Sequence, residues 1–402
     1  MNLTTPPSPT SLISRTVWLL SIVSLLTDVA SEMLYPIMPL YLTTIGFSVA
    51  GIGLLEGVAE AVAGLTKGPF GSWSDRSGRR LPFVRVGYGL SAIAKPMIGL
   101  LTGVGWVFAA RTLDRLGKGI RTAARDALLS DESTPSTRGR VFGLHRAMDT
   151  LGAVIGPGLA LLYLHIAPAD YRSLFSWAFV PGMLAIGLTV VLRDKRTMAP
   201  VVLRKPVSWR AFFDYWTRSS PAYRRLVGGL LVFALVNSSD VFLLLKARQA
   251  GLTDTAVIGL YIFYNVVYAA TAYPAGQLAD RIGLKQVLVG GLVLFALVYG
   301  GMSVAGNWII LGGVFALYGL YAAATEGVVK ALISNLAAPG ETATAIGTYA
   351  GFQSIAALVA SVGAGLVWTG AGPTVVFGLA GSVALGVAVY LAWWLHPDKV
   401  LN

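Results

Sequence analysis

The stretch GSWSDRSGRR, residues 71–80, returns later in the chain as GQLADRIGLK, residues 276–285. Two glycines, an aspartate and an arginine recur at a constant displacement of 205 positions, so that Gly71, Asp75, Arg76 and Gly78 match Gly276, Asp280, Arg281 and Gly283. A second pair of similar stretches, DALLSDESTP (126–135) and KALISNLAAP (330–339), is displaced by 204. The nearly equal displacements indicate two duplicated halves, an arrangement that in membrane transporters places a binding site at the interface between the repeats.

The composition assigns these halves to a membrane. Of the 402 residues, 55% are hydrophobic and 12% charged, with a mean hydropathy of +0.68. A helix needs roughly 20 apolar residues to cross a bilayer, about twice the length of a barrel strand. The sequence predicts twelve such helices, over 15–42, 50–70, 82–104, 105–128, 140–164, 172–193, 224–247, 256–276, 284–304, 307–336, 342–370 and 373–396.

Lysine and arginine set the expected orientation. They gather in the loops after the second, fourth and sixth spans, whereas opposite loops such as TGAGPT (369–374) carry none. Arg172, Lys246 and Arg248 are exceptions. Because basic loops stay in the cytoplasm, we expect both termini there, in a bacterial inner membrane. The predicted organisation is a cytoplasmic tail (1–14), a six-helix bundle (15–193), a basic linker (194–223), a second six-helix bundle (224–396) and a tail (397–402).

Several function classes find no support in the sequence. The chain has no cysteine and three scattered histidines, which argues against a metal site. The net charge of +12 lies in blocks between apolar spans, as membrane topology requires, and does not point to nucleic acid. We find no complete phosphate-binding loop and no nucleophile–base arrangement, so neither an ATPase nor another enzyme is expected.

The loop GSWSDRSGRR is similar to the signature between helices 2 and 3 of the major facilitator superfamily of secondary transporters. The resemblance implies an all-α membrane protein with twelve transmembrane helices in two pseudo-symmetric six-helix bundles. It also implies a conformational latch, in which a glycine turn holds an aspartate against the N-terminal end of a helix. The expected latch residues are Gly71, Asp75, Arg76, Gly78, Arg79, Gly276, Asp280, Arg281 and Gly283.

Two further stretches resemble the twelve-span drug:proton antiporter branch of that superfamily. One is PIMPLYLTTIG (36–46), at the end of the first span. The other is an antiporter-type motif in the fifth span, made by Gly143, Gly152, Gly156 and Pro157. Ala160 and Leu161 stand where this branch has paired glycines, so the match is incomplete. The resemblance implies that the motif shapes helix contacts and does not bind substrate, as small residues do in membranes generally.

The fourth span leads into a charged stretch, DRLGKGIRTAARDALLSD (114–131). One face of this helix carries a stripe of polar and basic residues that begins just before the stretch: Arg111, Arg115, Lys118, Thr122 and Arg125. Counting the helical rise places Arg111 to Lys118 inside the membrane and Arg121 and Arg125 at the cytoplasmic surface, with the rest mostly a solvated loop. Charges at membrane depth should be paired and face the protein interior.

Carboxylates on neighbouring spans could pair with these cations or carry protons. Either they are fixed ion pairs that hold the bundle together, or one of them binds and releases a proton during transport. The candidates for proton coupling, with Asp28 and Glu56 foremost, are Asp28, Glu32, Glu56, Glu60 and Asp149. Alternatively, Arg111, Arg115 and Arg146 could receive an anionic substrate.

The second half is richer in tyrosine and amide side chains at matching positions. These groups suit a semi-polar organic ligand, through packing, hydrogen bonds or cation–π contacts. Helix packing with satisfied hydroxyls is the alternative for each of them. Besides the three arginines, the candidate substrate-binding residues are Asn237, Asp240, Tyr261, Asn265, Tyr268, Tyr318, Tyr349 and Gln353. Glu326 and Lys330 form an i,i+4 pair that is more typical of structure than of catalysis.

Together these features predict a monomeric transporter that moves a small organic solute across the bilayer by alternating access. It uses the transmembrane proton gradient and no cofactor. Proton-coupled efflux is the first expectation, and an organic-anion exchanger or symporter that uses the basic stripe of the fourth span is the alternative. A sensor or membrane enzyme on the same scaffold is a more distant possibility.

Overall fold

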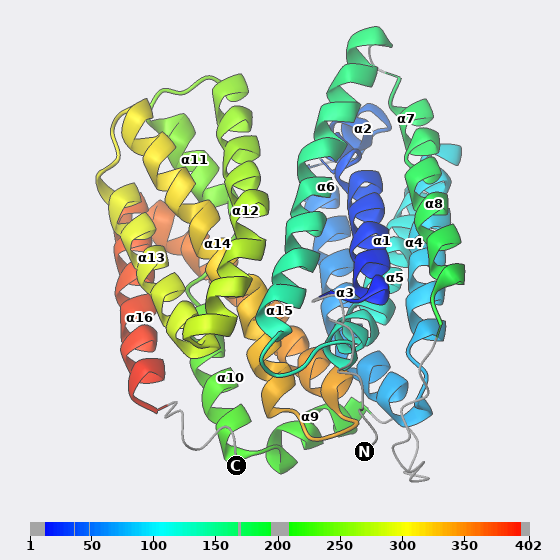
Figure 1. Cartoon of the computed structure of the whole chain (residues 1–402). Helices are drawn as coiled ribbons and strands as arrows, with labels where there is room; N and C mark the ends of the chain where they lie inside the picture. The colour runs from blue at the N-terminus through cyan, green and yellow to red at the C-terminus, as the bar shows by residue number, and fades with distance from the viewer. Residues whose placement is uncertain (1–12, 36, 48, 168–169, 194–208, 395–402) are drawn as a thin grey trace, which may run out of the picture.

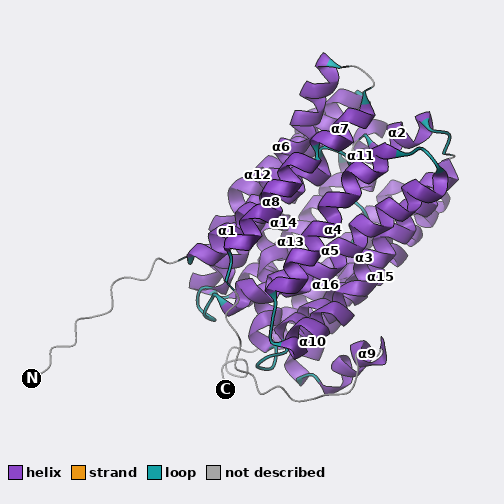
Figure 2. Cartoon of the chain, turned by 90° about the vertical axis from the view of Figure 1, so that its right-hand side faces the viewer, coloured by secondary structure: helices purple, strands orange, loops and turns teal. Residues whose placement is uncertain are grey.

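The computed structural model describes residues 13–35, 37–47, 49–167, 170–193 and 209–394. All regular elements in these ranges are helices, coloured purple in Figure 2. Helices satisfy their own backbone hydrogen bonds, which long apolar segments need in a bilayer. The predicted C-terminal tail lies outside the described residues, as do residues 1–12 of the N-terminal tail, Pro36 of the first span and residues 194–208 of the linker.

The first half contains the six predicted spans, two of them interrupted. The first span consists of α1 and α2, and the sixth of α7 and α8. The helices are α1 (Arg15–Glu32), α2 (Met38–Thr44), α3 (Val49–Ser77), α4 (Leu81–Leu100), α5 (Val104–Asp131), α6 (Arg138–Ile166), α7 (Tyr171–Trp177) and α8 (Phe179–Val191).

The second half repeats this order. Its first span is again interrupted, here over residues 235–240, of which the last four are polar. The helices are α10 (Pro221–Ala234), α11 (Val241–Gln249), α12 (Asp254–Ile282), α13 (Leu284–Val304), α14 (Trp308–Leu336), α15 (Thr342–Ala371) and α16 (Pro373–Trp394). The helices α3 and α12 both have 29 residues, with Pro69 and Pro274 at the same displacement as the loop motifs.

The two halves form two helix bundles that stand side by side in Figure 1. The predicted twelve-helix, two-bundle fold class is confirmed. By length and composition alone, six described segments could cross a membrane, namely α6, α7 with α8, α13, α14, α15 and α16. The interruption of the first span in each half, and the many charges of α5, account for three of the spans that these criteria do not find.

The halves meet along two equivalent helix pairs, α3 with α15 and α6 with α12. A Cβ atom at Gly71 of α3 would collide with the carbonyl oxygen of Ala343, and one at Gly276 of α12 with that of Gly139. These equivalent glycines therefore let the backbones of the two halves approach closely, in the same way on both sides of the molecule.

The described part of the linker contains α9 (Trp209–Arg218), at the lower end of Figure 1. The ring of Tyr215 lies edge-on to that of Tyr223 in α10, with centroids 5.3 Å apart. Trp216 contacts Phe352 of α15, and Arg218 Nη1 lies 2.8 Å from Glu341 Oε1. The helix α9 is thus attached to the second half beside the start of α15.

Candidate functional site

The end of the molecule where α3 ends and α4 begins, here called the loop-motif end, joins the two halves. There Asp75 accepts hydrogen bonds from the backbone nitrogens of Ala343 and Thr344, at 3.3 and 2.6 Å, and from Thr344 Oγ1 at 2.7 Å. These groups form the first turn of α15, whose free N–H groups attract a carboxylate. Arg80 Nη1 lies 2.6 Å from Asp75 and its Nε bonds Asp131 at 2.6 Å.

Asp280 makes the equivalent contact from the second half to the first. It accepts hydrogen bonds from the backbone nitrogens of Gly139 and Arg140, at 2.8 and 3.0 Å, in the first turn of α6. Arg140 Nε adds a third bond at 2.8 Å. Each loop motif therefore places its aspartate on a helix of the opposite half, and Gly78 and Gly283 supply the positive φ values of 61° and 108° that the turns need.

The arginines of the first motif lie differently from the prediction. Arg80, which was not among the expected latch residues, is the one bonded to Asp75, whereas Arg79 and Arg281 are exposed. A buried arginine can hold two carboxylates at once, which an exposed one does only weakly.

Four of the predicted charged residues form a network inside the first half. Arg111 binds Glu56 with two hydrogen bonds, at 2.9 and 2.8 Å, and Arg115 lies 3.2 Å from Glu60. Lys95 and Arg111 also flank Asp114, at 3.4 and 3.3 Å. This network links α3, α4 and α5, and its members do not line the central cavity. Its geometry matches the fixed ion pairs that were one of the two expectations.

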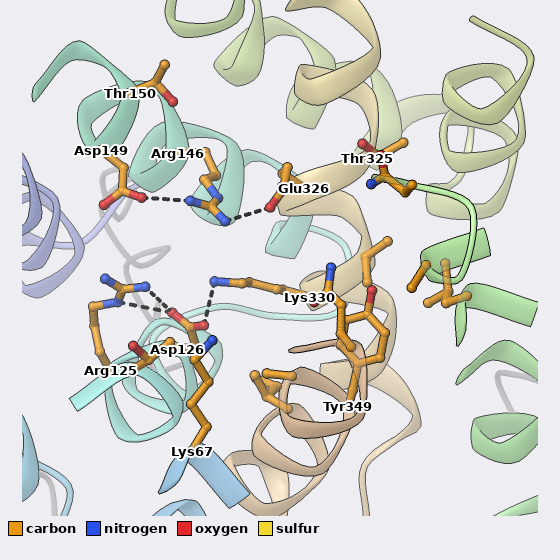
Figure 3. A pocket seen from close by; sticks show the side chains of 18 of the residues that line it. Lys67, Arg125, Asp126, Arg146, Asp149, Thr150, Thr325, Glu326, Lys330 and Tyr349 are labelled. Carbon is orange, nitrogen blue, oxygen red and sulfur yellow. Dashed lines mark hydrogen bonds and ion pairs between the residues drawn. The ribbon is translucent and has the colours of Figure 1, made fainter. Parts of the chain in front are cut away.

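A cavity of about 370 Å³ lies between the two halves. Nine of the twelve lining residues from the first half are charged, compared with two of the sixteen from the second half. The predicted residues that line it are Asp28, Glu32, Arg146, Asp149, Asn237, Asn265, Tyr349 and Gln353. Figure 3 shows part of this lining, with α5 and α6 opposite α14 and α15.

Two carboxylates lie next to each other on the first-half wall. The side chains of Asp28 in α1 and Asp149 in α6 are within hydrogen-bonding contact. Asp149 also accepts from Ser24 Oγ and, at 2.7 Å, from Arg146 Nη1. Two carboxyl groups can share a hydrogen bond only when one of them carries a proton. Glu32 lines the same wall four residues after Asp28.

The glycines of the antiporter-type motif place these carboxylates. A Cβ atom at Gly152 would come within 2.9 Å of Asp28 Cβ, and one at Gly156 within 3.0 Å of the Glu32 carbonyl carbon. Gly143 instead faces Ala272 and Gly276 of α12 in the other half, while Pro157 is buried within α6. Glycine at these positions lets α6 pack closely against α1 and α12.

The side of the cavity nearest the loop-motif end, here called the floor, carries ion pairs between the halves. Asp126 of α5 accepts from Arg125, at 3.0 and 2.9 Å, and lies 2.6 Å from Lys330 Nζ of α14. Arg146 reaches Glu326 of α14 at 2.6 Å. The dashed lines in Figure 3 follow these pairs. Glu326 and Lys330 thus bind partners in the other half and not each other.

The prediction that the second half of the charged stretch is mostly a solvated loop was wrong. Arg121 and Arg125 are 5% and 6% exposed, and α5 continues as a helix to Asp131. Arg121 lies over the ring of Tyr88, 4.6 Å from its centroid, and donates to Ser91 Oγ at 2.7 Å. The helix continues where a loop was expected, because neighbouring helices surround its charged part and supply partners.

The second-half wall is formed by apolar and aromatic side chains. Phe233 and Tyr321 line it, with ring centroids 6.2 Å apart, and Asn237 Nδ2 donates to the Tyr321 hydroxyl at 3.3 Å. Asn265 lines the cavity and donates to the Tyr261 backbone oxygen at 3.0 Å. A wall of this kind fits the flat, largely apolar part of an organic molecule.

The remaining second-half candidates lie outside the cavity lining. Asp240 accepts hydrogen bonds from the hydroxyls of Tyr264 and Tyr318, at 2.8 and 2.5 Å, beside the interruption between α10 and α11. Tyr261 packs edge-on against Tyr264, and Tyr268 is buried. For Asp240 and Tyr318 the geometry matches the expectation of packing with satisfied hydroxyls, whereas the buried Tyr268 hydroxyl has no hydrogen-bond partner among the described residues.

Four residues of the cavity floor were not among the predicted site residues. Lys67, Asp126, Glu326 and Lys330 all line the cavity. A signal was present, since Asp126 and Lys330 begin the second pair of repeated stretches. A linear repeat does not reveal that its two equivalent residues touch.

The comparisons with known proteins agree with this architecture. The profile of the Major Facilitator Superfamily matches residues 20–264 and 226–402. The chain belongs to this superfamily. The resemblance predicted from GSWSDRSGRR is therefore confirmed, and the protein is an integral, multi-pass membrane transporter.

Two relatives cover most of the chain. An uncharacterised transporter of this superfamily from Methanocaldococcus jannaschii is 34% identical over 367 residues, which are 89% of each protein. The multidrug resistance protein MdtH of Photorhabdus laumondii is 26% identical over 359 residues, 87% of this chain and 84% of MdtH. Among solved structures, the human organic anion transporter MFSD10 has a TM-score of 0.75 at 18% identity, covering 96% of this chain and all of that one (100%). This last likeness concerns the fold alone.

Proposed function

We propose that this transporter exports a small organic solute in exchange for protons. The observation that carries the proposal is the contact between Asp28 and Asp149 on the cavity wall. A pair of carboxyls that can hold one proton, placed where solute and water can enter, has the chemistry of a coupling site. The similarity to MdtH, a multidrug resistance protein, supports efflux.

We further propose that the loop-motif end faces the cytoplasm. The basic loops lie there, and basic loops remain on the cytoplasmic side during membrane insertion. Asp75 and Asp280 hold the two halves together at this end. In this orientation the structure corresponds to an outward-facing state, from which opening the floor would expose the cavity to the cytoplasm.

Protonation can act on the contacts between the halves through Arg146. Its guanidinium bonds Asp149 on one side and Glu326 of the other half on the other. A proton on Asp149 removes the charge that holds Arg146 to its own half, so Arg146 is free to follow Glu326. Deprotonation restores the bond. Proton binding and movement of the halves would thereby be linked.

The test uses the purified protein in liposomes with an acid interior and a pH-sensitive dye inside. Pools of organic cations and then of organic anions are added outside, and solute-driven proton release is recorded. We expect Asp28→Asn and Asp149→Asn to abolish proton release while substrate binding persists. Glu60→Gln, a carboxylate outside the cavity, is the matched control and should retain coupling. Full coupling in both aspartate variants would refute the proposal.

The second candidate, transport of an organic anion, retains only Arg146 of the three predicted arginines in the cavity lining. Arg111 and Arg115 are bound to carboxylates and lie outside the cavity lining. Lys67 and Lys118 do line it, and within the described residues neither makes an ion pair. A proton response to anion pools alone in the liposome experiment would favour this function. In either case we expect a monomer that needs the proton gradient and no cofactor.

A further inference from the structure

Asp126 and Lys330 occupy equivalent positions in the two halves, displaced by 204 residues, and they touch each other. Their side-chain atoms Oδ2 and Nζ are 2.6 Å apart. Equivalent residues of two pseudo-symmetric bundles can meet only where the axis relating the bundles passes between them. This ion pair therefore marks the pseudo-twofold axis at the floor of the cavity.

The floor holds more positive than negative charge. The carboxylate of Asp126 is already shared by Arg125, on Oδ1, and by Lys330, on Oδ2. Lys67 of α3 is a third cation there, and Figure 3 shows it pointing toward Asp126. Within the described residues the side chain of Lys67 makes no hydrogen bond or ion pair. Three cations thus surround one carboxylate that is 0% exposed.

The position of Lys67 keeps this excess charge at the interface between the halves. Its own backbone oxygen would come within 2.5 Å of a Cβ atom at Gly347 of α15, so the helices touch at this residue. A cation without a partner at membrane depth costs at least roughly 2.5 kcal/mol when it is not solvated or paired. The floor is consequently prepared for a second anion.

We propose that the cavity floor is a binding site for the anionic group of the transported solute. A carboxylate or a similar oxyanion binds Lys67 and Lys330, while Arg125 stays on Asp126. The apolar part of the same molecule lies against Phe233 and Tyr321 on the second-half wall. The inference deepens the proposed function by choosing its second candidate, transport of an organic anion, and by naming the substrate class as an amphiphilic organic anion; it rests on proton-coupled transport for the transport step.

Binding at this place would also loosen the closed floor. Because a solute carboxylate competes with Asp126 for Lys330, it weakens the ion pair that joins α5 to α14 on the axis. A ligand can shift a conformational equilibrium only through such a difference in contacts between states. Solute binding and opening of the floor are linked in this way.

The experiment measures binding by calorimetry to the purified full chain, without vesicles or a proton gradient. The probes are acetate, benzoate and naphthalene carboxylate, each compared with its neutral amide. We expect a preference for carboxylate over amide that grows with the ring system. In Lys67→Gln the affinity for the carboxylate should fall roughly tenfold, with the affinity for the amide unchanged. Lys285→Gln is the charge control, because within the part of the chain that the structure describes the Lys285 ammonium bonds only the Ala392 oxygen.

A second variant, Asp126→Asn, removes the resident competitor for Lys330. It should increase carboxylate affinity severalfold, an effect that simple damage to the fold would not produce. Equal binding of every carboxylate and its amide would overturn the inference. An equal loss of carboxylate affinity in Lys67→Gln and Lys285→Gln would also overturn it. Carboxylate-selective binding without solute-driven proton movement in liposomes would instead retain this site and reject proton-coupled export.

Discussion

The two walls of the cavity come from duplicated halves and yet differ in chemistry. The first half contributes nine charged side chains to the lining, and the second contributes two, together with aromatic and amide groups. At the loop-motif end the halves have remained alike, since Asp75 and Asp280 each bind the first turn of a helix in the opposite half. Joining two bundles requires a matching contact on each side, whereas ion coupling and solute recognition need only one set of residues each.

The largest expected effect concerns the axis pair of equivalent residues. Asp126→Lys or Lys330→Asp alone places like charges together and should cost at least about 3–5 kcal/mol, because each leaves buried charge uncompensated. The double exchange, Asp126→Lys with Lys330→Asp, should recover part of that loss, because it restores the pair on the axis but leaves Arg125 without the carboxylate that it binds. Thermal unfolding of the three purified variants measures it. A double variant no more stable than the singles would show that the two residues do not act as a pair.

A smaller effect distinguishes the first-half network from the cavity wall. Glu56→Gln leaves Arg111 with Asp114 alone and should destabilise the protein by about 2–3 kcal/mol. Proton coupling should stay intact, because Glu56 does not line the cavity. The measurements are the unfolding midpoint and the liposome pH signal. Asp28→Asn should give the opposite result, with little change in stability and a loss of proton coupling. Loss of proton coupling in Glu56→Gln at unchanged stability would show that Glu56 takes part in proton coupling after all.

The latch residues test whether the halves are equivalent in function as well as in geometry. Asp75→Asn and Asp280→Asn should each slow transport roughly tenfold, because each removes charge-assisted bonds of about 1.5–3 kcal/mol. Solute binding should not change. Asp75→Asn should be the slower of the two, since Asp75 also holds Arg80, which reaches Asp131. The measurement is the transport rate of each variant at saturating solute. Equal rates in the two variants would show that the contacts of Arg80 do not contribute to the latch.

The smallest effect is expected on the second-half wall. Phe233→Leu removes an aromatic surface that contributes about 0.5–1.5 kcal/mol beyond its area. We expect a change in which solutes are preferred, with larger losses for aromatic than for aliphatic carboxylates and an unchanged number of protons per solute. Competition between pairs of solutes in the liposome assay reads out this preference. A change in proton number would contradict the division of roles between the walls.

Much of the architecture could be predicted because it depends on local patterns. Apolar runs of sufficient length predict helices, and the displacement of GSWSDRSGRR to GQLADRIGLK predicts the duplication. The motif also predicted an aspartate at a helix N-terminus, although it did not say that the helix belongs to the other half. The sequence could not tell which carboxylates form fixed ion pairs and which are placed to bind a proton. In the structure Glu56 and Glu60 bind arginines, whereas Asp28 and Asp149 contact each other.

The sequence by itself determined that this protein is a duplicated, twelve-span helical membrane transporter, since hydropathy, loop charge and repetition act along the chain. Only the tertiary structure decided which charges face the cavity. Arg111 and Lys118 lie on one predicted helix stripe, yet the first is bound to Glu56 and the second lines the cavity. The contact of Asp126 with Lys330 likewise joins residues 204 positions apart. Such pairs depend on how whole bundles pack, and no local pattern carries that information.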